Sequence, residues 1–362
     1  KNLGFGAHAL NTMVRGKNEA EQFNVDRGTI SIRVGESSFT DQATGYLAGS
    51  FGRFHFLAGR DYLSWGAGLD YRLSLRLIDR PMDMLRLNFD LKKLRFTWFH
   101  GNLSGVDVQR YLVGHRLDFR LGKSINLAFY ETLVYGNRDR EWSYLNPILP
   151  YHVMEHQLGD LDNNTLGGDL VYFLRPGVRA FLEVFVDDFS SDYPLGTYWG
   201  NKLAVNGGFH WVAPFHFSEF ELKTTYTRID PWVYTHNDSA LSYTHYGESI
   251  GSQLGPNADR VRAVINYQPH HDSRWEIRYA YKRKGAGSIF DQHSYELNGK
   301  HKNFLAGIVE KTSEFGLALR QQFKRDVFFG FDLTFSYLHN RALQAGADGW
   351  RREGFFYMQI RY

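Results

Sequence analysis

The sequence predicts an all-β protein, a transmembrane antiparallel β-barrel of about 16 strands with a range of about 14–18. Three observations lead to this fold class. Many segments alternate between apolar and polar residues with the two-residue period of a strand. Several of these segments approach the roughly 9–11 residues that a tilted strand needs to cross a bilayer. Short connections alternate with long ones, as they do in barrels with short periplasmic turns and long extracellular loops.

The last nine residues, 354–362, carry the clearest barrel signal. Phe356, Met358, Ile360 and Tyr362 fall on one face of a strand and leave a mixed face opposite. Many bacterial outer-membrane barrels end in an aromatic residue in this way. We therefore interpret this segment as the closing strand, and counting backward from it places the long connections outside the cell.

The N-terminal part alternates more weakly. Residues 3–9, 29–34 and 53–60 are expected to be strands, and residues 59–68, which contain several glycines, are expected to be a loop. From residue 85 onward the alternation is strong. Further strands are expected at 85–91, 94–98, 110–121, 125–135, 178–187, 219–226, 260–267, 274–282, 315–322 and 329–337, with long loops at 136–164, 190–201, 229–257, 285–312 and 339–350.

Composition is compatible with this interpretation. The mean hydropathy is −0.42 and no run of 18 apolar residues predicts a membrane helix, but a barrel strand needs only every second residue to be apolar. The chain has 36 glycines, 16% aromatic residues and no cysteine, so it has no disulfide and no thiolate metal site. The net charge of +3 without a basic cluster argues against nucleic acid as a partner.

Residues 1–362 show no linker, so one barrel domain is expected. Lys1 is not followed by the charged and apolar regions of a signal peptide, and we expect that peptide to have been removed. A soluble β-sandwich is the competing interpretation, with the polar face turned to solvent. Strand length and the alternation of short and long connections favour the barrel, whose lumen would be aqueous unless loops fold into it.

The candidate binding residues lie in the long loops. Aromatic rings stack on the apolar faces of sugars, while carboxylates, amides and guanidinium groups bond hydroxyls and charged groups. The candidates for polysaccharide binding are Arg138, Arg140, Glu141, Trp142, Tyr144, Asn146, Tyr151, His152, Trp199 and Trp232. The alternative is that these aromatic residues serve in the outer girdle and in loop packing, as in any barrel.

No catalytic, metal or cofactor site is expected. The sequence has no Gly-x-Ser-x-Gly elbow. Asp187 and Asp188 are adjacent on a strand, so they point to opposite faces and are poor candidates for a glycosidase pair. His152 and His156 are spaced i, i+4 and Asp160 to Asn163 offers oxygen atoms, but a polar turn explains these residues better than a metal site.

Several motifs occur in a definite order along the chain. They are Ala58-Gly59-Arg60 with Trp65-Gly66-Ala67-Gly68, then Tyr144-Leu145-Asn146-Pro147, then residues 155–160 leading into 163–169, then Val186-Asp187-Asp188-Phe189, and finally residues 250–259. Together they resemble the Wzi capsule-assembly family of outer-membrane proteins. The resemblance implies a lectin barrel that holds capsular or other surface polysaccharide at the cell exterior and catalyses no synthesis.

The expected protein is therefore a monomeric outer-membrane lectin. Its expected partners are surface or capsular polysaccharide, outer-membrane lipid and lipopolysaccharide, with other envelope proteins left open. Two alternatives remain: a passive diffusion porin with an inward-folded loop, and a scaffold for a larger assembly at the cell surface.

Overall fold

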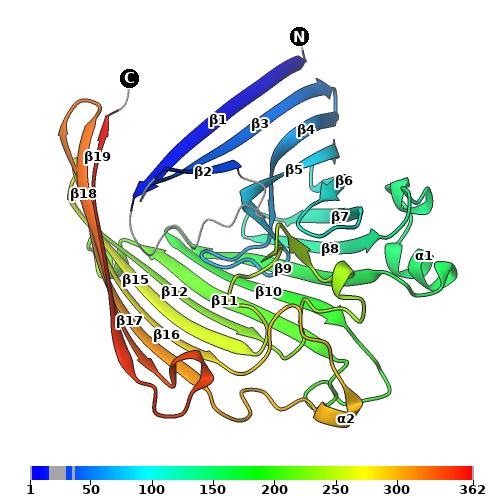
Figure 1. Ribbon diagram of the computed structural model, residues 1–362. Helices are drawn as coiled ribbons and strands as arrows, with labels where there is room; N and C mark the ends of the chain where they lie inside the picture. Colours follow the sequence, from blue (N-terminus) through cyan, green and yellow to red (C-terminus); the bar gives the residue numbers. More distant parts are fainter. Residues whose placement is uncertain (1, 16–29, 35–36, 361–362) are drawn as a thin grey trace.

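The computed structural model describes residues 2–15, 30–34 and 37–360, which form a 17-stranded sheet that curls around a central space (Figure 1). Every ladder in this sheet is antiparallel. β1 (Leu3–Arg15) pairs along β3 (Ser37–Phe51), and β2 (Ile30–Val34) pairs with the first residues of β3. Without β2, 16 strands follow one another in succession, so the all-β prediction of about 16 strands is confirmed.

The remaining strands of the sheet pair with their sequence neighbours. They are β4 (Phe54–Trp65), β5 (Leu75–Asp90), β6 (Leu94–Leu103), β7 (Arg110–Leu121), β8 (Ile125–Gly136), β9 (Asn163–Arg175), β10 (Val178–Asp188), β11 (Lys202–Val212), β12 (Phe220–Ile229), β15 (Ala258–His270), β16 (Ser273–Lys284), β17 (Glu310–Lys324), β18 (Val327–His339) and β19 (Gly349–Ile360). No ladder joins β19 to β1 within the described residues, and the two strands stand apart in Figure 1.

Short elements occupy the connections. They are η2 (Ser143–Leu145), α1 (Tyr151–Leu158), η3 (Pro214–His216), η4 (Ser239–Leu241), the hairpin of β13 (Thr244–His245) and β14 (Glu248–Ser249), α2 (Tyr295–Asn298) and η5 (Arg341–Leu343). None of the described helices is long and apolar enough to cross a membrane.

The predicted alternation of connections is confirmed. Short turns join β3 to β4, β5 to β6, β7 to β8, β9 to β10, β15 to β16 and β17 to β18, and the longest connections lie at the opposite end. The predicted loop at 59–68 is wrong in its first part, because β4 continues to Trp65. Gly59 belongs to the strand: its φ is +137°, and a Cβ atom there would lie 2.4 Å from the backbone oxygen of Gly45 on β3. The glycine therefore allows close strand contact instead of a turn.

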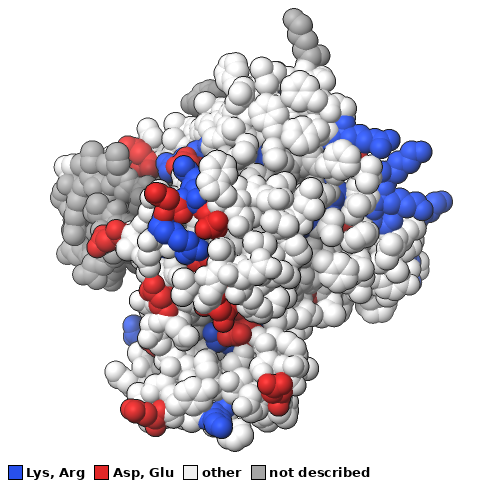
Figure 2. Space-filling view, turned by 90° about the vertical axis from the view of Figure 1, so that its right-hand side faces the viewer, with Lys and Arg blue, Asp and Glu red and all other residues white. Residues whose placement is uncertain are grey.

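The outer face of the sheet is apolar and exposed. Phe89, Val261, Tyr279 and Phe315 are each more than 40% exposed on this face, where water contact would be unfavourable and lipid contact is not. Figure 2 shows a wide uncharged area on the side where α1 lies, with charged residues mostly toward its margins. This is the surface of an outer-membrane barrel, and the protein is located in that membrane.

Two long connections fold into the lumen. The first, residues 66–74 between β4 and β5, is called the 66–74 loop; the second, residues 230–257 between β12 and β15, is called the 230–257 loop. They meet where the Tyr234 hydroxyl donates to the carbonyl oxygen of Leu73 (2.8 Å), and at the start of β5 the amide of Arg76 donates to the carbonyl oxygen of Ile250 (2.7 Å). Their apolar residues join those of the inner walls in one buried cluster.

Polar groups on the inner walls hold both loops in place. Arg110 on β7 donates to the carbonyl oxygens of Ala240 (2.9 Å) and Ser242 (3.2 Å). Glu183 on β10 accepts from the amide of Leu73 at 2.8 Å, and Asp187 on the same strand accepts from the amide of Tyr234 at 2.8 Å. Loop backbone that is buried must find such partners, so these side chains fix the loops across the lumen.

Candidate functional site

The segment 137–162, which connects β8 to β9 and contains η2 and α1, lies against the outside of the barrel wall. We call it the α1 cover (Figure 1). Its Tyr144 and Tyr151 are fully buried against outward-facing rings of β6 to β8. Trp98 donates its indole N–H to the Tyr151 hydroxyl at 2.7 Å, and the Tyr135 and Tyr144 rings lie 5.1 Å apart. The cover therefore removes part of this wall from lipid.

An ionisable pair lies beneath the cover. Glu131 on β8 faces outward, where its carboxylate is 2.8 Å from Nε2 of His115 on β7. The same carboxylate accepts from the backbone amide of Tyr151, the first residue of α1, at 2.9 Å and from Asn164 at 3.0 Å. A carboxylate is favourable at a helix N-terminus, where backbone N–H groups lack partners inside the helix. Glu131 thus attaches α1 to the wall.

The predicted arginines of the cover are also used in packing. Arg138 makes a bidentate pair with Asp162, with distances of 2.8 and 2.6 Å. Its guanidinium carbon lies 5.3 Å from the centre of the Tyr135 ring, and that of Arg140 lies 5.4 Å from the centre of the Tyr111 ring. The bond to Asp162 raises the pKa of Arg138 further, so this guanidinium remains charged while it holds the cover down.

The other predicted residues of the cover are mainly exposed or bonded locally. Glu141 accepts from the amide of Ser143, and Asn146 accepts from the amide of Ile148. The ring of His152 lies 4.3 Å from that of His156, and no group of three candidate metal ligands occurs in the described part of the chain. Trp142 is 83% exposed. It is the predicted aromatic residue of this segment whose ring remains accessible.

A second aromatic group is built from three other loops. Trp199 comes from the β10–β11 loop, Trp232 from the 230–257 loop, and His293 and Tyr295 from the β16–β17 loop. The Trp199 and His293 rings stack at 3.8 Å with an angle of 3°, while Trp232 and Tyr295 meet Trp199 edge-on at 6.5 and 5.6 Å. The structure therefore brings the two predicted tryptophans together and separates them from the predicted residues of the cover.

Two tyrosines extend this group. Tyr193 and Tyr198 stack at 4.0 Å, and the hydroxyl of Tyr198 lies 3.4 Å from that of Tyr295. This hydrogen bond, with partial burial, raises the pKa of Tyr198 to about 12. Tyr193 and Tyr295 are 42% and 55% exposed. The aromatic platform is the set formed by Tyr193, Tyr198, Trp199, Trp232, His293 and Tyr295.

Charged groups support and surround the aromatic platform. Beneath it, the buried ammonium of Lys302 lies 2.5 Å from an Asp230 carboxylate oxygen. Lys202 Nζ lies 5.8 Å from the centre of the Trp199 ring and 3.6 Å from the exposed carboxylate of Asp188. The platform therefore combines exposed aromatic surface with both hydrogen-bond donors and acceptors, which is the combination that a sugar requires.

Comparison with protein families decides the relationship of this chain. The family model described as capsule assembly protein Wzi matches residues 35–349. The chain belongs to the Wzi family. It matches no curated protein. The resemblance carried by the sequence motifs is thereby confirmed, and the Wzi family is not an enzyme family.

Solved structures show the same fold. The chain is similar to Escherichia coli Wzi, an outer-membrane protein involved in group 1 capsule assembly and a carbohydrate-binding β-barrel, with 13% identity, coverage of 99% of this chain and 84% of that chain, and a TM-score of 0.66. It is also similar to Pseudomonas aeruginosa OpdK (11% identity, 99% and 88% covered, TM-score 0.56). Acinetobacter baumannii OccAB2 is a third (13% identity, 98% and 88% covered, TM-score 0.51).

The motifs on which the resemblance to the Wzi family rests lie largely where loops are attached to the wall. Gly66 has a φ of +114°, and a Cβ atom there would lie 2.3 Å from the Glu183 carboxylate. Asp187 holds the 230–257 loop, and residues 163–169 begin β9 beside the α1 cover. By contrast, Tyr193, His293 and Tyr295 were not predicted. Their loop positions lack strand periodicity, and their aromatic character was the only available signal.

Proposed function

We propose that the protein is an outer-membrane lectin that binds capsular or other surface polysaccharide on its aromatic platform. The observation that carries this proposal is the joining of rings from three loops, with Tyr193 and Tyr295 exposed and the other rings half-buried, at the end of the barrel that bears the long connections. The similarity to Escherichia coli Wzi, itself a carbohydrate-binding β-barrel, gives it further support. Trp142 and Arg140, on the α1 cover, provide a smaller additional surface.

The chemistry follows from the groups present. The C–H face of a pyranose packs on an indole or phenol ring, and each aromatic contact contributes about 0.5–1.5 kcal/mol beyond burial. Asp188, whose side chain is exposed, accepts from hydroxyls next to Trp199, while the buried ammonium of Lys202 lies close to the Trp199 ring and to this carboxylate. Several weak contacts along a repeating polymer raise the overall affinity through multivalency. We propose binding without catalysis.

A passive porin is the alternative that the sequence left open. In a porin the lumen conducts solutes, whereas here the 66–74 loop and the 230–257 loop pack on each other and on both walls. We therefore expect a silent barrel in planar bilayers. A steady open conductance of the purified protein would favour the porin.

The lectin proposal is tested by Trp199→Ala with Trp350→Ala as the matched control. Trp350 is 66% exposed, lies beside Tyr337 and is outside the platform. Titration of purified capsular polysaccharide into the detergent-solubilised protein should show about fivefold weaker binding for Trp199→Ala, from the loss of about 1 kcal/mol of stacking. The control should bind as the unchanged protein does. Unchanged binding by a correctly folded Trp199→Ala would exclude the platform.

A further inference from the structure

The turns at the periplasmic end differ in charge around the rim. Four consecutive turns, from the one between β3 and β4 to the one between β9 and β10, carry six exposed basic residues: Arg53, Lys92, Lys93, Arg120, Lys123 and Arg175. None of the six takes part in an ion pair within the described chain. We call this set the basic rim.

The carboxylates near the basic rim are already neutralised. Asp90 makes a bidentate pair with Arg95, with distances of 2.6 and 2.8 Å. Asp118 accepts from Arg116 at 2.9 Å. Four turns in succession thus present positive charge without a free acidic group to balance it.

The opposite half of the same rim is balanced. Its turns carry Lys324 and Arg325 as cations and Glu219, Asp272 and Asp326 as carboxylates. Arg325 pairs with Asp326, and His271 lies against Asp272. The excess of positive charge is therefore a local property of the β3–β10 side.

Apolar residues lie immediately beside the basic rim on the outer face. Phe51, Phe89, Leu91, Leu121 and Leu174 at the strand ends are each between 40% and 61% exposed. A soluble anion would use the cations alone. A molecule that uses both surfaces must carry an anionic head and an apolar tail.

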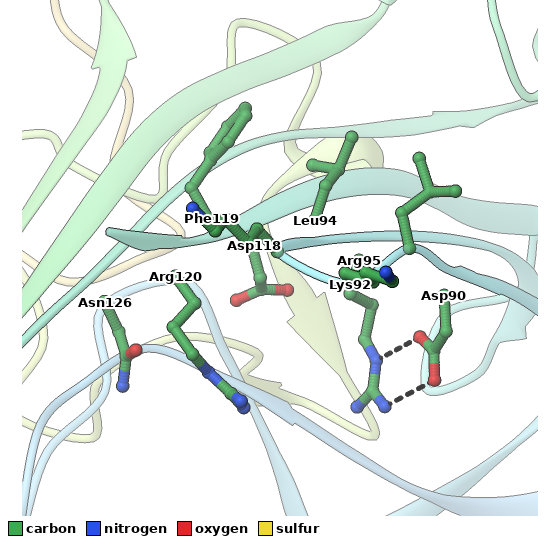
Figure 3. Close-up of a pocket in the computed structure, with 10 residues that line it drawn as sticks. Asp90, Lys92, Leu94, Arg95, Asp118, Phe119, Arg120 and Asn126 are labelled. Atoms are coloured by element: carbon green, nitrogen blue, oxygen red, sulfur yellow. Dashed lines mark hydrogen bonds and ion pairs between the residues drawn. The ribbon is translucent and has the colours of Figure 1, made fainter. Parts of the chain in front are cut away.

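A pocket of about 450 Å³ lies at the end of the sheet, between the β5–β6 and β7–β8 turns. Figure 3 shows Arg95, Arg120 and Asn126 extending to one side of the sheet, while Leu94 and Phe119 extend to the other. Lys92 and Lys93 line the same pocket from the turn. Because Arg95 is paired with Asp90, the cations available to a ligand are Lys92, Lys93 and Arg120.

We propose that the basic rim binds the phosphate of an anionic phospholipid of the inner leaflet, whose acyl chains lie on the adjacent apolar wall. Basic residues close to a membrane surface attract anionic headgroups, and the effect accumulates with their number and declines with salt. An acidic soluble protein is disfavoured because the cations lie at the edge of the lipid-facing belt. The site is independent of the outer loops and of the lectin proposal.

The test uses the full chain in neutral detergent with defined lipids, and native mass spectrometry counts the lipids retained. The variant is Lys92→Gln/Lys93→Gln/Arg120→Gln/Lys123→Gln, and the matched control is Lys324→Gln/Arg325→Gln on the balanced half. The unchanged protein and the control should retain phosphatidylglycerol in preference to phosphatidylethanolamine. The fourfold variant should retain phosphatidylglycerol about tenfold less well, or worse. A charge-conserving variant, in which the three lysines become arginine and Arg120 becomes lysine, should retain it as the unchanged protein does.

Four outcomes would overturn the proposal. They are equal retention by the fourfold variant, no preference for phosphatidylglycerol, full displacement of the lipid by inorganic phosphate, and tighter binding of polyglutamate than of lipid. The last two would indicate a free-anion site and a soluble acidic partner, respectively. Folding is judged by heat-modifiable gel migration. If the fourfold variant does not fold, Lys92 and Lys93 are changed in one variant and Arg120 and Lys123 in another, and each of these two variants should lose part of the lipid retention.

Discussion

The α1 cover and the aromatic platform are both rich in aromatic residues, and both belong to connections at the same end of the barrel, yet they use their rings in opposite ways. Under the cover, Trp98, Tyr111 and Tyr135 on the outer wall offer a matching aromatic surface, and Tyr144 and Tyr151 are buried on it. The platform loops instead pack ring on ring and leave the rings of Tyr193 and Tyr295 exposed. What lies beneath a loop therefore decides whether its aromatic residues stabilise the fold or remain available to a ligand.

Among the substitutions that test this comparison, Tyr151→Ala is expected to have the largest effect on the stability of the α1 cover. It removes a fully buried ring and leaves the Trp98 indole N–H without its partner. Truncation of a large buried aromatic residue costs about 3–5 kcal/mol. Protease cleavage within 137–162 should rise strongly while polysaccharide binding stays unchanged. Loss of binding in parallel would show that the cover and the platform are not separate.

A smaller loss of stability is expected from Glu131→Gln. The amide can still accept from the Tyr151 backbone, but the ion pair with His115 and the charge at the start of α1 are lost. Weakening a buried hydrogen bond to a charged group costs about 1.5–3 kcal/mol. Hydrogen exchange of the α1 amides should accelerate, and exchange in β15 and β16 should serve as the internal reference. Equal protection in both proteins would contradict this role of Glu131.

The cover should also respond to pH through Glu155. Burial, and then Asp160 and Asp162 nearby, raise the pKa of this carboxyl from 4.5 to about 8. The docked cover thus binds a proton that the released segment gives up, so docking is strongest below about pH 4.5 and weakens as pH rises toward 8. Proteolysis of 137–162 should increase across this window. In Glu155→Gln the rate should be independent of pH there, after correction for the protease itself.

The smallest effect is expected from Trp142→Ala. The ring is almost fully exposed on the cover and is separate from the platform, so stability should change by less than about 0.5 kcal/mol. Polysaccharide affinity should fall by less than about twofold, which is below one full stacking contact. An effect as large as that of Trp199→Ala would move the main binding surface from the platform to the cover.

Much of the barrel could be predicted from the sequence because strand alternation is local: Leu85 to Leu91 and Phe329 to Tyr337 show their inner and outer faces without reference to any partner. Gly59 was misinterpreted because a glycine in a strand and a glycine in a turn look alike until the neighbouring backbone is known. The cover depends on Trp98 and Glu131, which are far from α1 in sequence. Its helix was therefore not predicted.

The binding candidates were predicted only in part, because local sequence patterns do not contain long-range contacts. Trp199 and Trp232 were identified from their residue type, but His293, which stacks on Trp199, comes from a connection that lies more than 90 residues further along the chain. Tyr144 and Tyr151 were selected by the same criterion and are buried. Residue type indicates the capacity to bind a sugar, whereas exposure depends on long-range packing that a local pattern does not contain.

The Glu131–His115 pair has a consequence for how the protein reaches its membrane. Two ionisable side chains on the outer surface of a hairpin would oppose its entry into hydrocarbon if they were bare. The helix that shields them lies in the connection that follows β8, and its first amide donates to the carboxylate. Membrane insertion is therefore easiest if α1 folds back before β7 and β8 enter the bilayer. The Glu131–His115 pair is then already covered when it reaches the hydrocarbon.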